Sequence, residues 1–281
     1  MLGRLIAETI HAELALVIAL PYDPPLVGLE EYERALKEDS ERLLRRAGPR
    51  LEGVRFETLV YGGDSAPRLL HDVAEREDAE MIVLGSTHRG PLGRLVPGSV
   101  AERLLAGAPC AVAVAPRGYA SGEPAQVRSI GVGFDGSDES SAALTLATRV
   151  AAAAGSRLVL YAIVEPPGLA SPDAAWIAIS ALGGEEWESE TGRSAKLEGA
   201  LSEALERLPD GIEATGELIA GDPARVLVER SAETDLLVLG SRGYGPFRRV
   251  LLGDVSGEVM RGAACPVVAV PRAAAAGSLR S

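Results

Sequence analysis

Short apolar runs alternate with longer amphipathic segments along most of the chain. Near the C-terminal end, the apolar runs at residues 236–240 and 266–270 predict two buried strands. A glycine-punctuated loop fills residues 241–253, and residues 254–261 have the pattern of a helix. Strands that alternate with helices at this spacing predict the α/β class, with a parallel sheet covered by helices on both faces.

The same order of segments occurs once before in the chain. A loop, a helix and a strand all match their later counterparts at a single offset of 155 residues. One register held over so many segments predicts a tandem duplication, and a period this long indicates two domains rather than a solenoid. The matching pairs are 81–85 with 236–240, 95–98 with 250–253, and 110–116 with 265–271.

The beginning of the chain fits the duplication less completely. Residues 2–13 predict a helix with an apolar face, and residues 14–20 predict a strand that matches residues 158–164 at an offset of 144. The second copy also has a strand at residues 129–134, whose counterpart would fall before Met1. We therefore expect the first domain to lack its first strand, through loss or through a start assigned too late. Its sheet should then show a gap, or close it by direct pairing of 14–20 with 81–84.

Periodicity assigns the remaining elements. It predicts helices over 30–48, from the turn at 62–67 to about 76, and over 195–208. It also predicts strands over 54–60 and 212–219. The expected division is a first domain at 1–117, a linker at 118–127, a second domain at 128–273 and a tail at 274–281.

Composition and charge narrow the class of protein. The 281 residues are 47% hydrophobic and carry a net charge of −12, which argues against a general nucleic-acid binder. No apolar run is long enough to span a bilayer and no signal peptide is visible, so we expect a cytoplasmic protein without a membrane partner. Cys110 and Cys265 occupy equivalent positions, and we expect two buried core residues rather than a disulfide or a metal site.

Three features of the second copy should meet at one edge of its sheet. Ligands of open parallel sheets bind at the carboxyl ends of the strands, where the strand order reverses. Asp135 ends the first strand there and could accept hydrogen bonds from a ribose or a base. The backbone beside Ile163 could meet an adenine edge, and the loop 240–253 could hold phosphates ahead of a helix N-terminus.

These residues resemble the universal stress protein family in its tandem form. Gly240, Gly243 and Gly253 match the spacing of the family's nucleotide-binding pattern, and residues 132–137 resemble its first strand and acidic residue. The resemblance implies two flavodoxin-like domains, related to the adenine-nucleotide α-hydrolases, with five-strand parallel sheets in the order 3-2-1-4-5. It also implies that the last strands, at 111–115 and 266–270, pair antiparallel across the two domains.

The resemblance further implies a regulatory stress protein that binds ATP, with or without Mg²⁺, mainly in the second domain. At most it would hydrolyse ATP slowly, because no catalytic residue stands out. The alternative is a scaffold that dimerises or pairs its domains and holds no nucleotide. The candidate binding residues are Gly133, Asp135, Ile163, Gly240, Ser241, Arg242, Gly243, Gly253, Asp254 and Val255, with Gly85, Gly98 and Ser99 as weaker counterparts in the first domain.

Two positions depart from the family pattern. Asp254 stands where the family has Ser or Thr, and its carboxylate could cap the following helix and repel phosphate. An occupied loop and an empty one therefore both remain open. In the first domain His88 replaces the second glycine, and Asp135 has no counterpart, so that domain is the weaker candidate.

Overall fold

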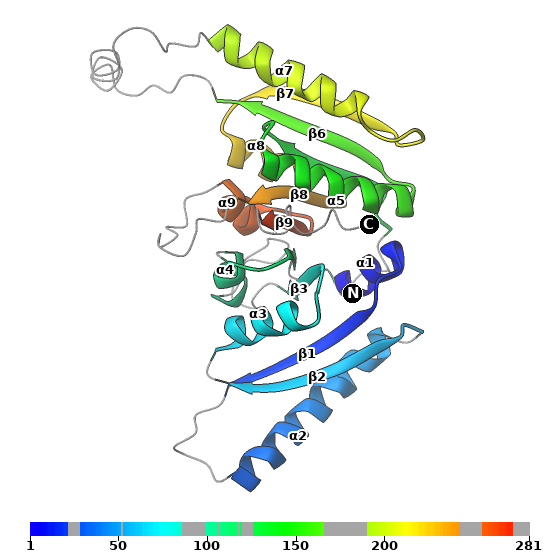
Figure 1. Cartoon of the computed structure of the whole chain (residues 1–281), viewed down its shortest axis with the longest axis vertical. Coiled ribbons are helices and arrows are strands. Elements are labelled where there is room, and N and C mark those ends of the chain that lie inside the picture. Colours follow the sequence, from blue (N-terminus) through cyan, green and yellow to red (C-terminus); the bar gives the residue numbers. More distant parts are fainter. Residues whose placement is uncertain are drawn as a thin grey trace, which may run out of the picture.

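The computed structural model describes residues 1–21, 29–51, 53–63, 65–85, 99–105, 107–116, 119, 126–165, 190–241 and 255–271. Helices and strands alternate along the chain, as predicted (Figure 1). The helices are α1 (Leu2–Ile10), α2 (Leu29–Ala47), α3 (Ala66–Arg76), α4 (Ser99–Leu105), α5 (Asp138–Ala154), α7 (Glu190–Glu206), α8 (Pro223–Arg230) and α9 (Val255–Gly262), with a 3₁₀ turn η1 (Gly48–Arg50). The strands are β1 (Leu14–Pro21), β2 (Phe56–Gly63), β3 (Met81–Gly85), β4 (Ala111–Ala115), β5 (Ser129–Phe134), β6 (Arg157–Val164), β7 (Ala214–Ala220), β8 (Leu236–Ser241) and β9 (Val267–Pro271).

The second copy forms the complete sheet that the resemblance implies. Its five strands follow the order β7-β6-β5-β8-β9, and every neighbouring pair among them is parallel. In order of appearance this is 3-2-1-4-5, as predicted. Strand β5 lies in the middle, paired with β6 on one side and β8 on the other, so the strand order reverses around it.

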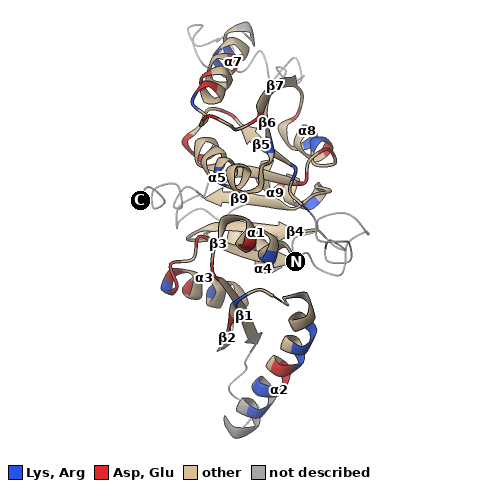
Figure 2. Ribbon diagram, turned by 90° about the vertical axis from the view of Figure 1, so that its right-hand side faces the viewer, with Lys and Arg blue, Asp and Glu red and all other residues tan. Residues whose placement is uncertain are grey.

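The two copies are joined through their last strands. Strand β4 pairs antiparallel with β9, with Val112 opposite Ala269 and Val114 opposite Val267. All four residues are at most 1% exposed. The pairing therefore covers two apolar strands that would otherwise be exposed edges. Figure 2 shows β4 and β9 side by side at the middle of the molecule. The predicted antiparallel junction is confirmed, and it makes one seven-stranded sheet from both copies.

The sheet of the first copy is divided. Strands β3 and β4 belong to the seven-stranded sheet, whereas β1 and β2 pair only with each other in a separate two-stranded sheet. Among the described residues no strand lies between β1 and β3. The expected gap is therefore present, and direct pairing does not close it. The first copy was expected to lack its first strand, and in its described part the remaining strands do not form one sheet: two join the second copy in a mixed seven-stranded sheet and the other two form a parallel pair.

Helices cover both faces of the large sheet and bury two apolar layers. One layer packs beneath α1, α5 and α7 and includes Ile130, Val132 and Val238. The other lies toward α8 and α9 and includes Leu237, Leu239 and Met260. Helix α1 buries Leu2 and Ile6 as its periodicity predicts. In the described part of the chain, no helix is long and apolar enough to cross a membrane.

The two cysteines are free and buried, as expected. Burial raises the pKa of the Cys110 thiol to about 11, partly offset by a hydrogen bond involving the Ile82 backbone. Burial likewise raises the pKa of Cys265 to about 11, partly offset by its contact with the Thr234 hydroxyl. Both thiols therefore remain protonated at neutral pH and behave as small apolar core residues.

Equivalent valines in the two copies provide a matched test of the divided sheet. Val238 in β8 is 1% exposed, while its counterpart Val83 in β3 is half-buried beside the gap. We expect Val238→Ala to lower the free energy of unfolding by about 2–3 kcal/mol, since two methyl groups and their packing are lost. Val83→Ala should cost about 1 kcal/mol or less. Denaturant titration of both variants measures the difference, and equal losses would contradict the exposed position of β3.

The raised thiol pKa values predict slow alkylation and a loss of stability at high pH. Folded thiols should resist iodoacetamide at pH 8, whereas the unfolded chain should react at both cysteines. Because the folded pKa is above the ordinary value of 9.0, the stabilisation is present below about pH 9. It should be lost as the pH rises through about 11. Rapid reaction of both thiols in the native protein at pH 8 would show that burial is overstated.

Candidate functional site

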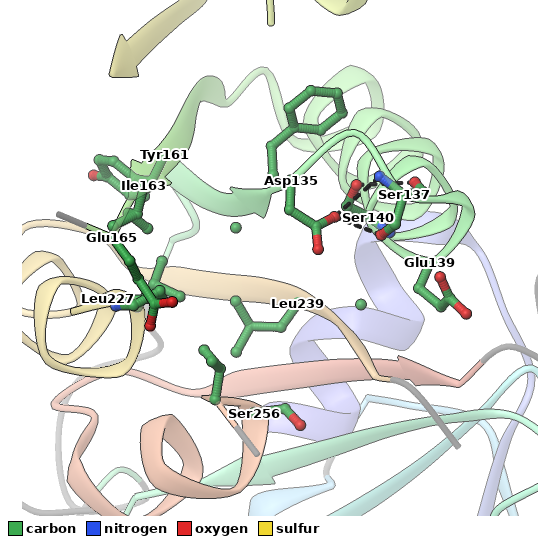
Figure 3. A pocket seen from close by; sticks show the side chains of 15 residues that line it. Asp135, Ser137, Glu139, Ser140, Tyr161, Ile163, Glu165, Leu227, Leu239 and Ser256 are labelled. Atoms are coloured by element: carbon green, nitrogen blue, oxygen red, sulfur yellow. Dashed lines mark hydrogen bonds between the residues drawn. The ribbon is translucent and has the colours of Figure 1, made fainter. Parts of the chain in front are cut away.

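A cavity of about 300 Å³ lies at the carboxyl ends of the central strands of the second copy (Figure 3). Strands β5, β6 and β8 end at it, and residues of α5, α8 and α9 complete the described wall. This is the point where the strand order reverses, which is the usual ligand position in open parallel sheets. The lining residues are Gly133, Phe134, Asp135, Ser137, Glu139, Ser140, Tyr161, Ile163, Glu165, Pro223, Leu227, Leu239, Gly240, Val255 and Ser256.

A tight turn after β5 carries the polar part of the wall. Gly136 has φ +77°, a left-handed conformation that favours glycine. The turn brings Ser137 back toward Asp135, whose Oδ1 accepts hydrogen bonds from the Ser137 N–H at 3.0 Å and from the Ser137 hydroxyl. The Ser137 Oγ in turn accepts from the Ser140 N–H at 3.2 Å and caps α5. The Asp135 carboxylate is thus held in place at the cavity wall.

The opposite wall is mixed in character. Ile163 lies near the end of β6 and Glu165 directly follows that strand, and Leu227 of α8 lies on the same side of the cavity (Figure 3). Val255 and Ser256 begin α9, so the N-terminal end of that helix borders the cavity. Backbone N–H groups at a helix N-terminus favour negatively charged ligands.

Close packing accounts for two of the glycines. A Cβ on Gly240 would lie 2.5 Å from the carbonyl carbon of Glu139 and 2.8 Å from the Ser140 nitrogen. Only glycine therefore lets the end of β8 approach the first turn of α5. A Cβ on Gly133 would lie 2.7 Å from Leu239 Cδ2, so this glycine leaves room for a side chain of the neighbouring strand β8.

The predicted binding residues divide into three groups. Five of them line the cavity, whereas Ser241 is buried at the end of β8 and is not part of the lining. Four others, together with Gly98 of the first copy, fall outside the described residues. The five lining residues are Gly133, Asp135, Ile163, Gly240 and Val255. The four outside are Arg242, Gly243, Gly253 and Asp254.

The first copy lacks the surroundings of this site in its described part. Gly85 ends β3 and Ser99 begins α4, so both occupy positions equivalent to the second copy. However, a Cβ on Gly85 would meet no atom within 4 Å. The first residue of α1, Leu2, is equivalent to Leu146 in the middle of α5. Helix α1 therefore has no counterpart of the first turn of α5, which packs on Gly240.

Sequence reasoning missed several polar residues of the wall. Ser137, Ser140 and Ser256 line the cavity, as do Glu139 and Glu165. The sequence held a signal for Ser137 and Ser140. Ser137 is followed by two acidic residues and, after two serines, by an apolar run, which indicates a helix N-terminus directly after β5. The position of Ser256 depends on where α9 begins, which the sequence fixes only approximately.

The described lining is acidic rather than basic. Asp135, Glu139 and Glu165 contribute carboxylates, and no Lys or Arg is among the described lining residues. Tyr161 adds a phenol that stays neutral, because burial, then Glu217 and Glu233, raise its pKa to about 12. A polyanion in this cavity would therefore depend on backbone N–H groups or on an accompanying cation.

The universal stress protein family model matches residues 6–116 and 126–271. The chain belongs to the universal stress protein family. A universal stress protein of Mycobacterium tuberculosis is 30% identical over 271 residues, covering 94% of this chain and 85% of the relative. One of Mycolicibacterium smegmatis is 29% identical over 268 residues, covering 92% of this chain and 85% of the relative. The tandem arrangement is thus shared over nearly the whole length.

Solved structures support the fold. A universal stress protein from Archaeoglobus fulgidus has a TM-score of 0.71 at 18% identity, covering 96% of this chain and 93% of that one. Another universal stress protein was solved in complex with cAMP. That protein is 25% identical over 52% of this chain and 98% of its own, with a TM-score of 0.38.

The two equivalent glycines give a test of the packing at the site. We expect Gly240→Ala to lower the free energy of unfolding by about 1–3 kcal/mol, because the new methyl group overlaps the backbone of α5. Gly85→Ala should be close to neutral, since the same methyl group meets open space. Thermal and denaturant unfolding compare the pair. A neutral Gly240→Ala variant would show that β8 and α5 are further apart than described.

Proposed function

We propose that this universal stress protein is a regulatory protein that binds ATP or another adenine nucleotide in the cavity of its second copy. The observation that carries the proposal is the position of the Asp135 carboxylate at the strand-order reversal, inside a cavity of about 300 Å³. This volume lies at the lower end of the range for small-molecule sites, about 300–1,000 Å³.

The walls suggest a mode of binding. Asp135 keeps Oδ1 bonded to Ser137 and would offer acceptor capacity to a ribose hydroxyl or a base amine. The backbone beside Ile163 would meet the adenine edge, against the apolar surface of Leu227 and Leu239. The phosphates would lie toward Val255 at the start of α9, where helix N–H groups favour an anion.

The acidic lining favours a nucleotide that carries a divalent cation. Asp135, Glu139 and Glu165 all border the cavity, and bare polyphosphate close to the Asp135 carboxylate would be repelled. Mg²⁺ bound to the phosphates reduces that repulsion and takes oxygen ligands readily. The nucleotide is proposed as a regulatory ligand, and Mg²⁺ would enter with it rather than occupy a site of its own.

The test begins with the native protein. Purified full-length chain is denatured and its supernatant is assayed for ATP and AMP, and binding of added ATP is measured by calorimetry with Mg²⁺ or with EDTA. We expect Mg-ATP to bind and EDTA to weaken binding. Asp135→Ala should weaken binding by at least about tenfold, because a charge-assisted hydrogen bond of about 1.5–3 kcal/mol is lost.

Asp210→Ala is the matched control. Asp210 is an exposed aspartate that precedes β7. It therefore lies at the amino ends of the strands, whereas the cavity lies at their carboxyl ends. It should bind Mg-ATP as the wild type does. If the native protein releases no nucleotide and binds neither ATP nor AMP, the proposal fails and the interaction scaffold becomes the better account.

A further inference from the structure

Helix α3 carries three metal-ligating side chains in one group. His71 Nδ1 lies 3.8 Å from Asp72 Oδ1 and 3.7 Å from Glu75 Oε2. The ligand atoms of all three side chains lie within 4.8 Å of one another. In the described part of the chain, no other set of three or more His, Cys, Asp or Glu side chains comes together in this way. One imidazole and two carboxylates are thus within reach of a single ion.

The backbone of α3 keeps these side chains in register. His71 and Glu75 are about one helical turn apart and share a face of the helix, and Asp72 is their neighbour on it. Val73 and Ala74 are buried, so the helix is anchored in the core. The imidazole is half-buried and both carboxylates are exposed. An ion could therefore reach the group from solvent without a rearrangement of the fold.

The distances and the ligand types suit Zn²⁺. In a tetrahedral zinc site with bonds of about 2.0–2.2 Å, neighbouring ligand atoms lie about 3.3–3.6 Å apart. The separations of 3.7 and 3.8 Å from His71 Nδ1 are only slightly longer, so small rotations of the Asp72 and Glu75 side chains would complete the set. A mixture of imidazole and carboxylate favours Zn²⁺ over Mg²⁺, which prefers oxygen ligands alone.

The second copy has an apolar contact at the position of the imidazole. When α3 and α8 are aligned at their N-caps, Val228 is the counterpart of His71. A Cβ on Gly262 of α9 would lie 2.9 Å from Val228 Cγ2, so the valine packs directly on that helix. A Cβ on Gly107, the counterpart of Gly262, would meet no atom within 4 Å. The first copy is therefore open where the second is closed.

A cavity of about 400 Å³ fills this opening between α3 and α4. His71 and Asp72 line it together with Gly107, Arg68 and Arg103. An ion held by the group would border the cavity, and zinc bound by three protein ligands keeps a fourth position for water or another ligand. The two arginines would favour an anion as that fourth ligand.

We propose that His71, Asp72 and Glu75 form a zinc site in the first copy, separate from the candidate nucleotide cavity of the second. The two carboxylates offset the charge of the ion, and the neutral imidazole supplies a nitrogen ligand. The fourth position takes water or a small anion from the cavity between α3 and α4. The site does not depend on the proposed nucleotide binding, because none of its residues belongs to the second copy.

The test uses the full-length chain without a histidine tag. Calorimetry follows the addition of Zn²⁺ to the metal-free protein, and NMR of the histidine side chains locates the ion. We expect one saturable Zn²⁺ site per chain and a shift of the His71 imidazole signals. The signals of the exposed His11 should stay unchanged. Mg²⁺ at the same concentrations should leave the His71 signals in place.

Two variants remove ligands from the site. His71→Ala and Glu75→Gln should each weaken Zn²⁺ binding at least about tenfold, since even outer-shell partners of a metal are worth about 10–100-fold in affinity. His11→Ala and Glu77→Gln are the matched controls, because both residues are exposed and lie outside the group. Both controls should bind Zn²⁺ as the wild type does. If His71→Ala does not fold, Glu75→Gln decides, because it removes the charge and keeps the shape.

Asp135→Ala separates this site from the nucleotide cavity. The variant should bind Zn²⁺ as the wild type does, whether or not it still binds Mg-ATP. The proposal is overturned if the chain binds no Zn²⁺, if His71→Ala and Glu75→Gln bind it as tightly as the wild type, or if Asp135→Ala alone loses it.

Discussion

Strand β5, which lies between β6 and β8, determines both the candidate site and the difference between the two copies. In the second copy β5 pairs with β6 and β8 at once, and its glycines leave room for side chains of these two neighbouring strands. Its carboxyl end supplies Asp135, and the turn that follows starts α5. Strand β5 therefore accounts for the unbroken sheet of the second copy, for the position of the Asp135 carboxylate and for the helix that packs on Gly240.

The first copy shows what the fold becomes without that element in its described part. Pairing of β4 with β9 keeps half of its sheet attached to the second copy, because both strands would otherwise expose apolar edges. The other half, β1 and β2, stays together as a parallel pair. Gly85 keeps its place at the end of β3 but has no helix turn to approach. Among the described residues the two copies therefore differ: the second has the candidate cavity and a complete five-stranded sheet, and the first has a divided sheet.

Much of this architecture could be predicted from the sequence, because it depends on local patterns repeated at fixed offsets. The strands β3 and β4 and the apolar face of α1 follow from apolar periodicity and the duplication. The antiparallel junction of β4 with β9 was implied by the family resemblance. The sequence could not decide whether β1 pairs directly with β3 or leaves a gap, because direct pairing competes with packing under the helices. The role of Gly240 was also hidden, since spacing cannot distinguish a glycine near phosphate from one packed against a helix backbone.

We propose that the β5-α5 unit completes the nucleotide site, so a chain with one such unit among its described residues should bind one nucleotide. Native mass spectrometry of the full-length chain at saturating Mg-ATP counts bound nucleotides directly. The account predicts one nucleotide per chain. Two nucleotides per chain would show that the first copy forms a site without its central strand, and none would show that the cavity beside Asp135 serves another purpose.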